Sequence, residues 1–516
     1  MPDGVKDGSR SGALKLDGGG LPLIPQPTTS PTDPLNYPNW LKYLILAQVS
    51  LLAALATLGV AVINPAVVPL AKEFHISPVL ATYQTTVAIG TSSLGPLVLT
   101  PFANVYGRRP AYLISILVGF ASAVGSATAT SFGTLIVARV FTGLGPSAAL
   151  GIGAGTVIDI FYGHQRGRAM GIFTLMSTNG SHLAPIIGGY VARDRSWRWC
   201  FWAGAMLNGA MFLIILFFMP ETIFDRPNDS STEEIFVDDD KEKIVEFETA
   251  SIPVEPYHSP PMRIKTFIRR MWFWDLDRPA SRQMKAKDFV IKPLSLLKYP
   301  SVAFPVLYFS VTYGFASIEP ALTLATLFTK IYKFDTAQNG LANGLSLLIG
   351  ATLGELCSGS VTDAAMRRAR KRALEGGEAV SPELRLQGIW TGAITVPLGL
   401  LMYGLTIHFS VNFIAPCVGM AVACFGIQVI TSVCYTYSCS DCYRHRSNDV
   451  SLCFNFIRQL FGMTLGFYSI PFGNRIGFEW SFAVFAALCI VSFIPIVALM
   501  YRGKRWRIAL GEPSAY

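Results

Sequence analysis

The stretch GPLVLTPFANVYGRR, residues 95–109, decides the fold of this chain. It ends a long apolar run, turns at Tyr106-Gly107 and places Arg108-Arg109 before the next apolar run begins. Apolar runs of about 20 residues are long enough to cross a bilayer as helices, and arginines concentrate in short cytoplasmic loops. The stretch therefore predicts two membrane helices joined by a tight cytoplasmic turn.

A second stretch of the same design, GELCSGSVTDAAMRR, lies at residues 354–368. It too has a glycine at its start, a polar residue near its end and then Arg-Arg. The polar residue is Asn104 in the first copy and Asp363 in the second. One such unit in each half indicates a duplicated membrane protein.

The composition indicates an all-α membrane protein. Of the 516 residues, 51% are hydrophobic and only 15% are charged, whereas a soluble domain carries about 25% charged residues. The net charge of +9 comes with basic residues in the loops between apolar runs. Membrane orientation explains this placement, so we expect no nucleic-acid partner. The cysteines show no complete ligand pattern, so we expect neither a metal site nor a cofactor.

The apolar runs predict about twelve transmembrane helices in two six-helix bundles. In the first half they lie near residues 40–64, 80–105, 111–130, 134–158, 167–192 and 197–219. In the second half they lie near residues 301–328, 340–361, 386–408, 411–438, 450–472 and 480–501. The chain then divides into a disordered tail (1–39), an N-terminal bundle (40–219), a central loop (220–300), a C-terminal bundle (301–501) and a second tail (502–516). Most Lys and Arg residues fall in loops on one side, which predicts that both termini and the central loop are cytoplasmic.

Two predicted helices carry unusual residues. Arg139 lies inside an apolar helix, where a charge is costly, so it should face the protein interior and pair with an acid or with carbonyl groups. Small residues recur every fourth position in the same helix and predict close helix packing: Gly143, Ser147, Gly151 and Gly155. The next helix contains GSHLAPIIGG with Gly180, Pro185, Gly188 and Gly189. Such a segment suits a helix that rocks against its neighbours, and static close packing is the alternative.

These motifs together resemble those of the major facilitator superfamily. PFANVYGRR resembles the signature between its second and third helices, the segment at residues 139–143 its fourth-helix signature, and GSHLAPIIGG its antiporter signature. WRWCFW followed by Pro220-Glu221-Thr222, and DPLNYPNW before the first helix, resemble the fungal drug:proton antiporter branch. The resemblance implies a central cavity, alternating access, proton antiport and efflux. The chain departs from the family at Asn104, where an acid is usual, and at Ala184, where a glycine is usual.

Charged residues at helix ends are candidates for a cytoplasmic gate. Asp159 precedes Arg166, and Asp441 precedes Arg446, at equivalent boundaries of the two halves. We expect such pairs to break as the cavity opens inward, with ordinary helix-end electrostatics as the alternative. The predicted gating and conformational residues are Asn104, Gly107, Arg108, Arg109, Arg139, Asp159, Arg166, Gly180, Pro185, Gly188, Gly189, Asp363 and Asp441.

Ionisable groups inside helices are candidates for substrate or proton binding. Glu319, Glu355 and His182 could take a proton, and the two acids could also bind a cationic substrate. Arg458 could equally meet an anionic substrate. Polar and aromatic residues that could line an adaptable cavity are Tyr308, Tyr313, Asn343, Tyr403, Gln428, Asn455 and Gln459. For each candidate the alternative is a satisfied interior hydrogen bond.

The sequence thus predicts a monomeric secondary active transporter that works without a cofactor. We expect it to export a small organic compound (a drug, toxin or metabolite) from the cell across the plasma membrane, in exchange for protons. The vacuolar membrane is an alternative location. A proton symporter that imports an organic cation or nutrient, and a receptor that uses the transporter fold without flux, are the alternative functions. No nucleophile–base set appears, so we do not expect an enzyme.

Overall fold

The computed structural model describes residues 14–16, 23, 25–224, 254–256, 267, 269–272, 291–375, 382–443 and 446–511. Side chains are described for these residues except at positions 14–16, 164, 254–256, 292, 360–375, 440 and 441. Two predicted gating side chains, Asp363 and Asp441, therefore lie outside the described set. Most of the N-terminal tail and of the central loop lies outside it as well.

Long helices dominate both halves of the described chain. The first half contains η1 (Pro34–Asn36), α1 (Asn39–Ala61), η2 (Asn64–Ala66), α2 (Val67–Glu73), α3 (Pro78–Ser92), α4 (Leu94–Tyr106), α5 (Arg108–Ala127), α6 (Phe132–Leu144), α7 (Ala148–Ile160), α8 (Gly163–Asp194) and α9 (Trp197–Phe218). The second half contains α12 (Ile291–Ser295), η5 (Leu296–Lys298), α13 (Pro300–Tyr313), η6 (Gly314–Ile318), α14 (Glu319–Ile331), α15 (Thr336–Glu375), η7 (Pro382–Ile389), α16 (Trp390–His408), α17 (Ile414–Tyr435), η8 (Thr436–Cys442), α18 (Ser447–Ile476) and α19 (Phe478–Leu510). A short parallel pair joins β1 (Leu14–Leu16) to β2 (Val254–Pro256).

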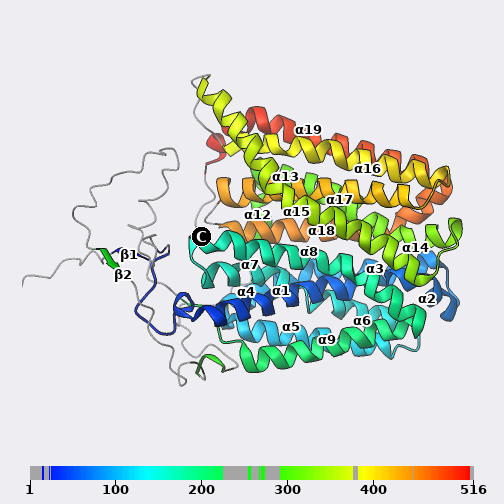
Figure 1. Ribbon diagram of the computed structural model, residues 1–516, viewed down its shortest axis with the longest axis horizontal. Coiled ribbons are helices and arrows are strands. Elements are labelled where there is room, and N and C mark those ends of the chain that lie inside the picture. Colours follow the sequence, from blue (N-terminus) through cyan, green and yellow to red (C-terminus); the bar gives the residue numbers. More distant parts are fainter. Residues whose placement is uncertain are drawn as a thin grey trace, which may run out of the picture.

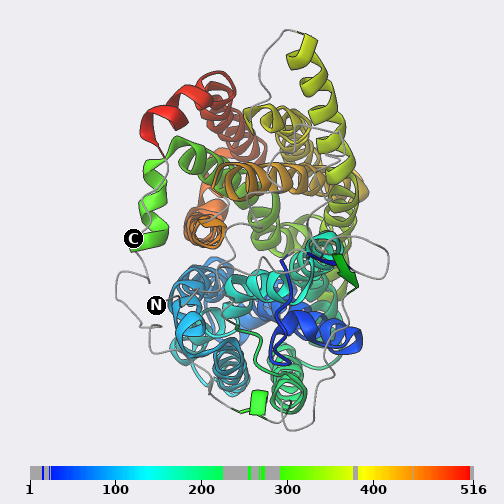
Figure 2. The ribbon, with the colours of Figure 1, turned by 90° about the vertical axis from the view of Figure 1, so that its left-hand side faces the viewer.

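The predicted fold class is confirmed. Within the described residues, eleven helical segments are long and apolar enough to cross a membrane, and α8 runs beside them in contact with α1 and α15. The helices form two groups, one from each half of the chain, which are stacked in Figure 1 and seen end-on in Figure 2. Contacts of α8 with α15, and of α3 with α18, join the two groups.

Two predicted helices of the first half are interrupted where the sequence suggested continuity. The helix expected at residues 80–105 is split into α3 and α4 at Ser93. The helix expected at residues 134–158 is split into α6 and α7 at positions 145–147. Pro146 lies at this break, and proline removes a backbone donor and clashes with the preceding helical turn. In the second half, the backbone widens into a π-helical turn at η6, directly before Glu319.

The two ends of the molecule differ in their chain connections. We call the end where α1 begins and α19 ends the tail side, which lies at the left in Figure 1. We call the opposite end the far side, which carries α2 and the connection between α14 and α15. Two buried apolar clusters lie within the first half, and a third lies in the second half and also includes Ile89 of α3.

On the tail side, a buried carboxylate holds the turn of residues 95–109. Gly107 adopts a φ of 109°, which favours glycine, and α5 begins directly after it. Glu221 is 2% exposed and accepts hydrogen bonds from the backbone N–H groups of Arg108 and Arg109, both at 3.0 Å. It also accepts from the N–H groups of Thr222 and Ile223, both at 2.9 Å. A negative group here satisfies the free donors at the start of α5 and complements the helix dipole.

Replacing this acid should destabilise the tail side. We expect Glu221→Ala to lower the free energy of unfolding by about 1–3 kcal/mol, because buried N–H donors lose a charged acceptor. The measurement is thermal unfolding of the full-length protein in detergent, followed by tryptophan fluorescence. Glu479→Ala is the control, since that carboxylate pairs with His408 at 2.9 Å where both side chains reach solvent, and such pairs contribute about 0–1 kcal/mol. Equal shifts for the two variants would contradict the assigned role.

Candidate substrate cavity

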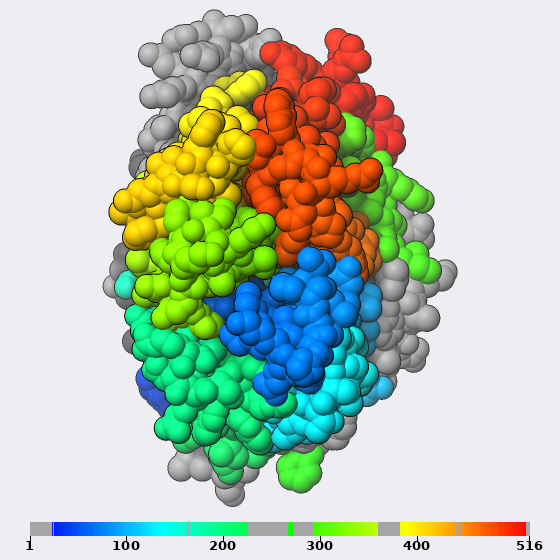
Figure 3. Space-filling view, turned by 90° about the vertical axis from the view of Figure 1, so that its right-hand side faces the viewer, coloured from blue at the N-terminus to red at the C-terminus, as the bar shows by residue number. Residues whose placement is uncertain are grey.

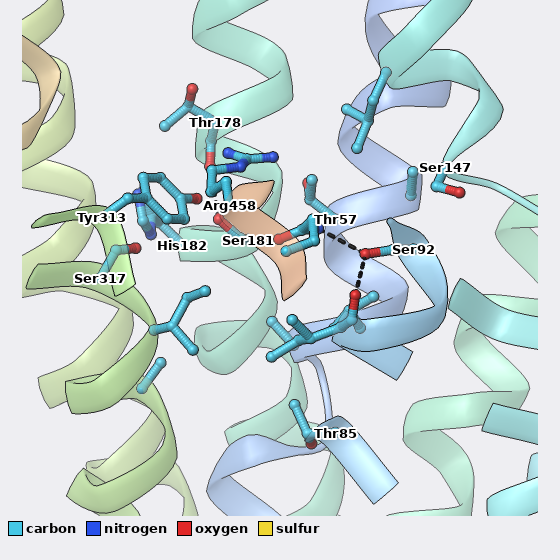
Figure 4. Close-up of a pocket in the computed structure, with 18 of the residues that line it drawn as sticks. Thr57, Thr85, Ser92, Ser147, Thr178, Ser181, His182, Tyr313, Ser317 and Arg458 are labelled. Carbon is cyan, nitrogen blue, oxygen red and sulfur yellow. Dashed lines mark hydrogen bonds between the residues drawn. The ribbon is translucent and has the colours of Figure 1, made fainter. Parts of the chain in front are cut away.

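A cavity of about 120 Å³ lies between the two halves of the chain. Side chains from α1, α3 and α8 meet side chains from α13, η6, α14, α15 and α18 around it (Figure 4). Its polar lining consists of Thr57, Asn64, Thr85, Ser92, Ser147, Ser177, Thr178, Ser181, His182, Tyr313, Ser317, Arg458 and Gln459. The remaining lining is aliphatic or glycine, so the cavity can hold an apolar body as well as polar groups.

Four of the predicted binding residues line this cavity: His182, Tyr313, Arg458 and Gln459. They come from three helices of both halves, and Figure 4 shows three of them around the same space. Gln459 donates a hydrogen bond to Ser92 Oγ at 2.6 Å, which joins α18 to α3 across the interface. His182 is 2% exposed, and its Nε2 lies 4.0 Å from Cys424 Sγ.

The other predicted binding residues lie outside the cavity lining: Tyr308, Glu319, Asn343, Glu355, Tyr403, Gln428 and Asn455. Glu355 accepts a hydrogen bond from Thr174 Oγ1 at 3.1 Å and thereby connects α15 to α8. Asn455 supports a cavity residue, because its Oδ1 accepts from Arg458 Nη2 at 3.0 Å. Helices that are apolar on every side do not reveal which face points to the cavity.

Glu319 lies inside the second half, one turn from the cavity wall. It is 1% exposed and has Tyr403 of α16 as an electrostatic neighbour. Its Oε2 atom and the Tyr403 hydroxyl both lack a hydrogen-bond partner among the described residues. This is a buried polar pair with unused hydrogen-bonding capacity, next to the π-helical turn.

Arg458 presents an uncompensated positive charge to the cavity. Its guanidinium carbon lies 4.5 Å from the centroid of the Tyr313 ring and 6.0 Å from that of Phe309. Its Nε has no hydrogen-bond partner among the described residues. No ion pair joins Arg458 to a described side chain. The group is thus held in position but not neutralised.

Arg139 is fully buried behind the cavity wall, in the first half. It donates to the carbonyl oxygens of Gly59 and Val60, both at 2.7 Å, and from Nε to Gln84 O at 3.4 Å. The sequence left open whether an acid or carbonyl groups would pair with Arg139. In the structure, carbonyl groups do so. A chain of hydrogen bonds continues from the Gln84 amide through Thr85 to Asn64, and the last two residues line the cavity.

The glycines of α8 allow backbone contact with helices on two sides. A Cβ atom added at Gly180 would lie 2.7 Å from Ala54 Cα of α1. One added at Gly189 would lie 2.7 Å from Thr336 O, and one at Gly340 would lie 3.0 Å from Gly189 Cα. The two halves therefore touch without intervening side chains near the far side, where α14 also meets α2 (Figure 3).

The helix-end gate candidates of the first half whose side chains are described lie on the tail side. Asp159 forms an ion pair with Arg108, and Arg166 donates from Nε to Phe161 O at 3.1 Å. Asn104 is exposed on α4. In the first half, the carboxylate that meets the turn arginine thus comes from the end of α7 and not from position 104.

Sequence reasoning missed two groups of residues. Glu221 was noted only as part of a family motif, although its carboxylate organises the start of α5. The hydroxyl groups of the cavity were also missed. Part of their signal is present in the sequence, because Thr85 and Ser92 are seven residues apart on α3 and so share one face of that helix. Within the described part of the chain, no three His, Cys, Asp or Glu side chains gather as metal ligands would.

Comparisons with known proteins agree with this architecture. The sequence pattern of the Major Facilitator Superfamily matches residues 49–467. The chain is 27% identical over 490 residues to the MFS-type transporter tndD of Aspergillus flavipes, covering 94% of this chain and 85% of that protein. It is 24% identical over 484 residues to the efflux pump radE of Floropilus chiversii, covering 92% of this chain and 83% of that protein.

A solved structure of a bacterial homolog of the human lysosomal transporter Spinster has the same fold. Its TM-score is 0.57 at 13% identity, and the match covers 93% of this chain and 100% of that one. The family pattern covers most of the sequence, and both halves contribute helices to one internal cavity. This protein therefore belongs to the Major Facilitator Superfamily and is a multi-pass membrane transporter, not an enzyme.

Proposed function

We propose that this transporter exports a small organic compound in exchange for protons, by alternating access. The observation that carries the proposal is the cavity between the two halves, lined by both and bounded toward the far side by backbone contacts of α8 with α15. A site between two bodies can be exposed to either side by rocking one body against the other. The name of the relative radE, an efflux pump, supports export.

The proposed orientation places the tail side in the cytoplasm. Arg108 and Arg109 lie at the tail-side turn, Arg166 and Arg168 begin α8, and the run at residues 502–507 ends α19. Basic residues in short loops favour the cytoplasmic side. The plasma membrane is the proposed location, with both termini inside the cell. In this orientation the contact of α8 with α15 is the closed outer gate.

Export and its alternatives make different predictions for metabolite levels. In cells that lack the protein we expect its substrate to accumulate inside and to fall in the medium, because the outward route is lost. Comparative metabolite profiling of cells with and without the gene product measures this. The compounds that change are then tested by counterflow in vesicles that contain the full-length protein. Accumulation in the medium instead would favour an importer, and no change in any compound, with loss of a cellular response, would favour a receptor.

The outer gate can be tested with two glycines of one helix. Gly189→Leu has no room against α15, and overpacking costs about 1–3 kcal/mol, so we expect about a tenfold or greater loss of counterflow rate as closure becomes less populated. Gly171→Leu is the matched control, because nothing lies within 4 Å of a Cβ atom added there. Rates are normalised to the amount of folded protein. Equal activity of the two variants would show that this contact is not part of the cycle.

We propose Glu319 as the proton-carrying group. It is buried in this arrangement, and one carboxylate oxygen lacks a partner among the described residues. An acid that alternates between a dry and a water-filled environment binds and releases a proton as its surroundings change. The adjoining π-helical turn gives α13 and α14 a place to shift relative to each other.

The proposal that Glu319 carries the proton can be tested by comparing substrate exchange without a pH gradient with accumulation driven by a gradient. We expect Glu319→Gln to keep substrate exchange without a pH gradient but to lose accumulation driven by a gradient, because the amide cannot release a proton. Both modes are measured in vesicles with the compound found by profiling. Glu479→Gln, at the far-side start of α19, should retain both. Gradient-driven accumulation at the normal level in Glu319→Gln would rule out this residue as the carrier.

A further inference from the structure

The charges around the cavity identify a class of substrate. We propose that the cavity takes an organic anion, whose acidic group binds Arg458 and whose apolar part lies against Tyr313 and the aliphatic wall. The inference rests on the proposed function in one respect: the bound anion is taken to be the transported compound. The binding site itself is argued from the residues of the cavity.

Arg458 is arranged as a receptor for an oxyanion. Asn455 holds Nη2 at 3.0 Å, and the Tyr313 ring supports one face of the guanidinium at 4.5 Å. The Nε donor has no partner among the described residues. A guanidinium group binds carboxylate, sulfonate or phosphate oxygens through paired donors, and holding it in advance reduces the cost of binding.

No described acid near the cavity can neutralise this charge. The described residues that line the cavity include neither Asp nor Glu. Glu355 of α15 binds Thr174, and Glu319 of α14 lies outside the cavity lining, beside Tyr403. His182, the other ionisable side chain in the wall besides Tyr313, is either neutral or positive. A charge at membrane depth requires a partner, and an anionic substrate supplies one.

The first half of the chain adds to the positive potential. Arg139 is fully buried behind Val60, and its described partners are neutral carbonyl groups. Its charge is therefore screened only by dipoles and acts on the nearby cavity through a medium of low dielectric constant. Hydroxyl groups of the first half line the same cavity, including those of Ser181 and Thr57 (Figure 4), which here donate to the carbonyl oxygens of Thr178 and Ser177.

The arrangement disfavours an organic cation. A cation in this space would meet Arg458 without a described carboxylate to attract it. It would also leave the guanidinium unpaired, so both charges would be buried uncompensated. The same geometry favours a substrate with a flat or ring-shaped body, because Tyr313 and the aliphatic side chains form one continuous surface beside the charge.

Charge-matched probes test this inference directly. We would measure binding to the purified full-length protein of naphthalene-2-sulfonate, naphthalene-2-sulfonamide and trimethyl(naphthalen-2-yl)ammonium, and of the corresponding cyclohexane compounds. The sulfonate and the quaternary ammonium keep their charge at every pH used. We expect the sulfonate to bind at least about tenfold more tightly than the cation of the same skeleton, which corresponds to one paired charge.

Three variants assign the preference to its residue. Arg458→Gln should remove the preference for the sulfonate, and Arg458→Lys should restore part of it, because charge is kept but the paired donors are lost. Arg475→Gln is the matched control, since it removes an arginine from the last turn of the same helix, outside the cavity. Thermal unfolding of each variant without probe shows that it is folded, and Arg458→Lys provides the comparison if Arg458→Gln does not fold.

Each outcome bears on either the inference or the proposed function. Tighter binding of a cation, equal binding of the three charge types, or failure of both sulfonates to bind would overturn the anion site. A sulfonate preference that survives in Arg458→Gln or disappears in Arg458→Lys would overturn the role of this residue. Export of a cationic compound in the profiling experiment would leave the proposed function intact and overturn the anion. Sulfonate binding, without counterflow of any compound that the profiling finds, would keep the anion site and overturn the proposed export.

Discussion

The backbone contact between α8 and α15 is the constraint on which the other features depend. Apolar burial does not drive helices together inside a bilayer, so close packing and hydrogen bonds must hold the two halves in contact. Gly189 and Gly340 provide the close packing. The hydrogen bonds from Thr174 to Glu355 at 3.1 Å and from Gln459 to Ser92 at 2.6 Å join the same two bodies. These contacts involve glycines and polar side chains, so the interface between the two halves does not depend on apolar burial alone.

Arg139 and Arg458, both inside membrane-spanning helices, illustrate two solutions to the cost of a charge in the membrane. Arg139 is satisfied by carbonyl oxygens of α1 and α3, and so connects three helices of the first half. Arg458 has only one described hydrogen-bond partner, Asn455, and keeps a donor unused. The first arginine finds its partners within the protein itself. Whether the charge of Arg458 is paired depends on what enters the cavity.

The sequence was sufficient to predict most of the helices, but it predicted only some of the residues that line the cavity. Hydropathy and the paired turns predicted the two bundles, because a bilayer imposes length and polarity on each span. The break at Pro146 could have been read from the same sequence, since proline rarely continues a helix without a kink or break. The interaction partners of Arg108 and Glu221 could not be predicted from the sequence, because they lie on segments far apart in sequence and meet only through packing. Arg458 and His182 were identified since charged groups inside spans are rare, whereas the hydroxyl groups of the wall are common in such helices and gave no comparable signal.

The unpaired guanidinium of Arg458 also affects the energetics of transport. An anion that leaves a cell with a negative interior moves down the membrane potential, and each elementary charge contributes about 2.3 kcal/mol per 100 mV. A proton that enters in exchange moves a positive charge in the opposite direction and gains the same amount. One such exchange therefore displaces two charges, so the cycle would be electrogenic and the voltage would drive it even where the pH is equal on both sides. Under the proposed exchange of an anion for a proton, the charge of one side chain in the cavity would thus set how strongly the membrane voltage contributes to transport.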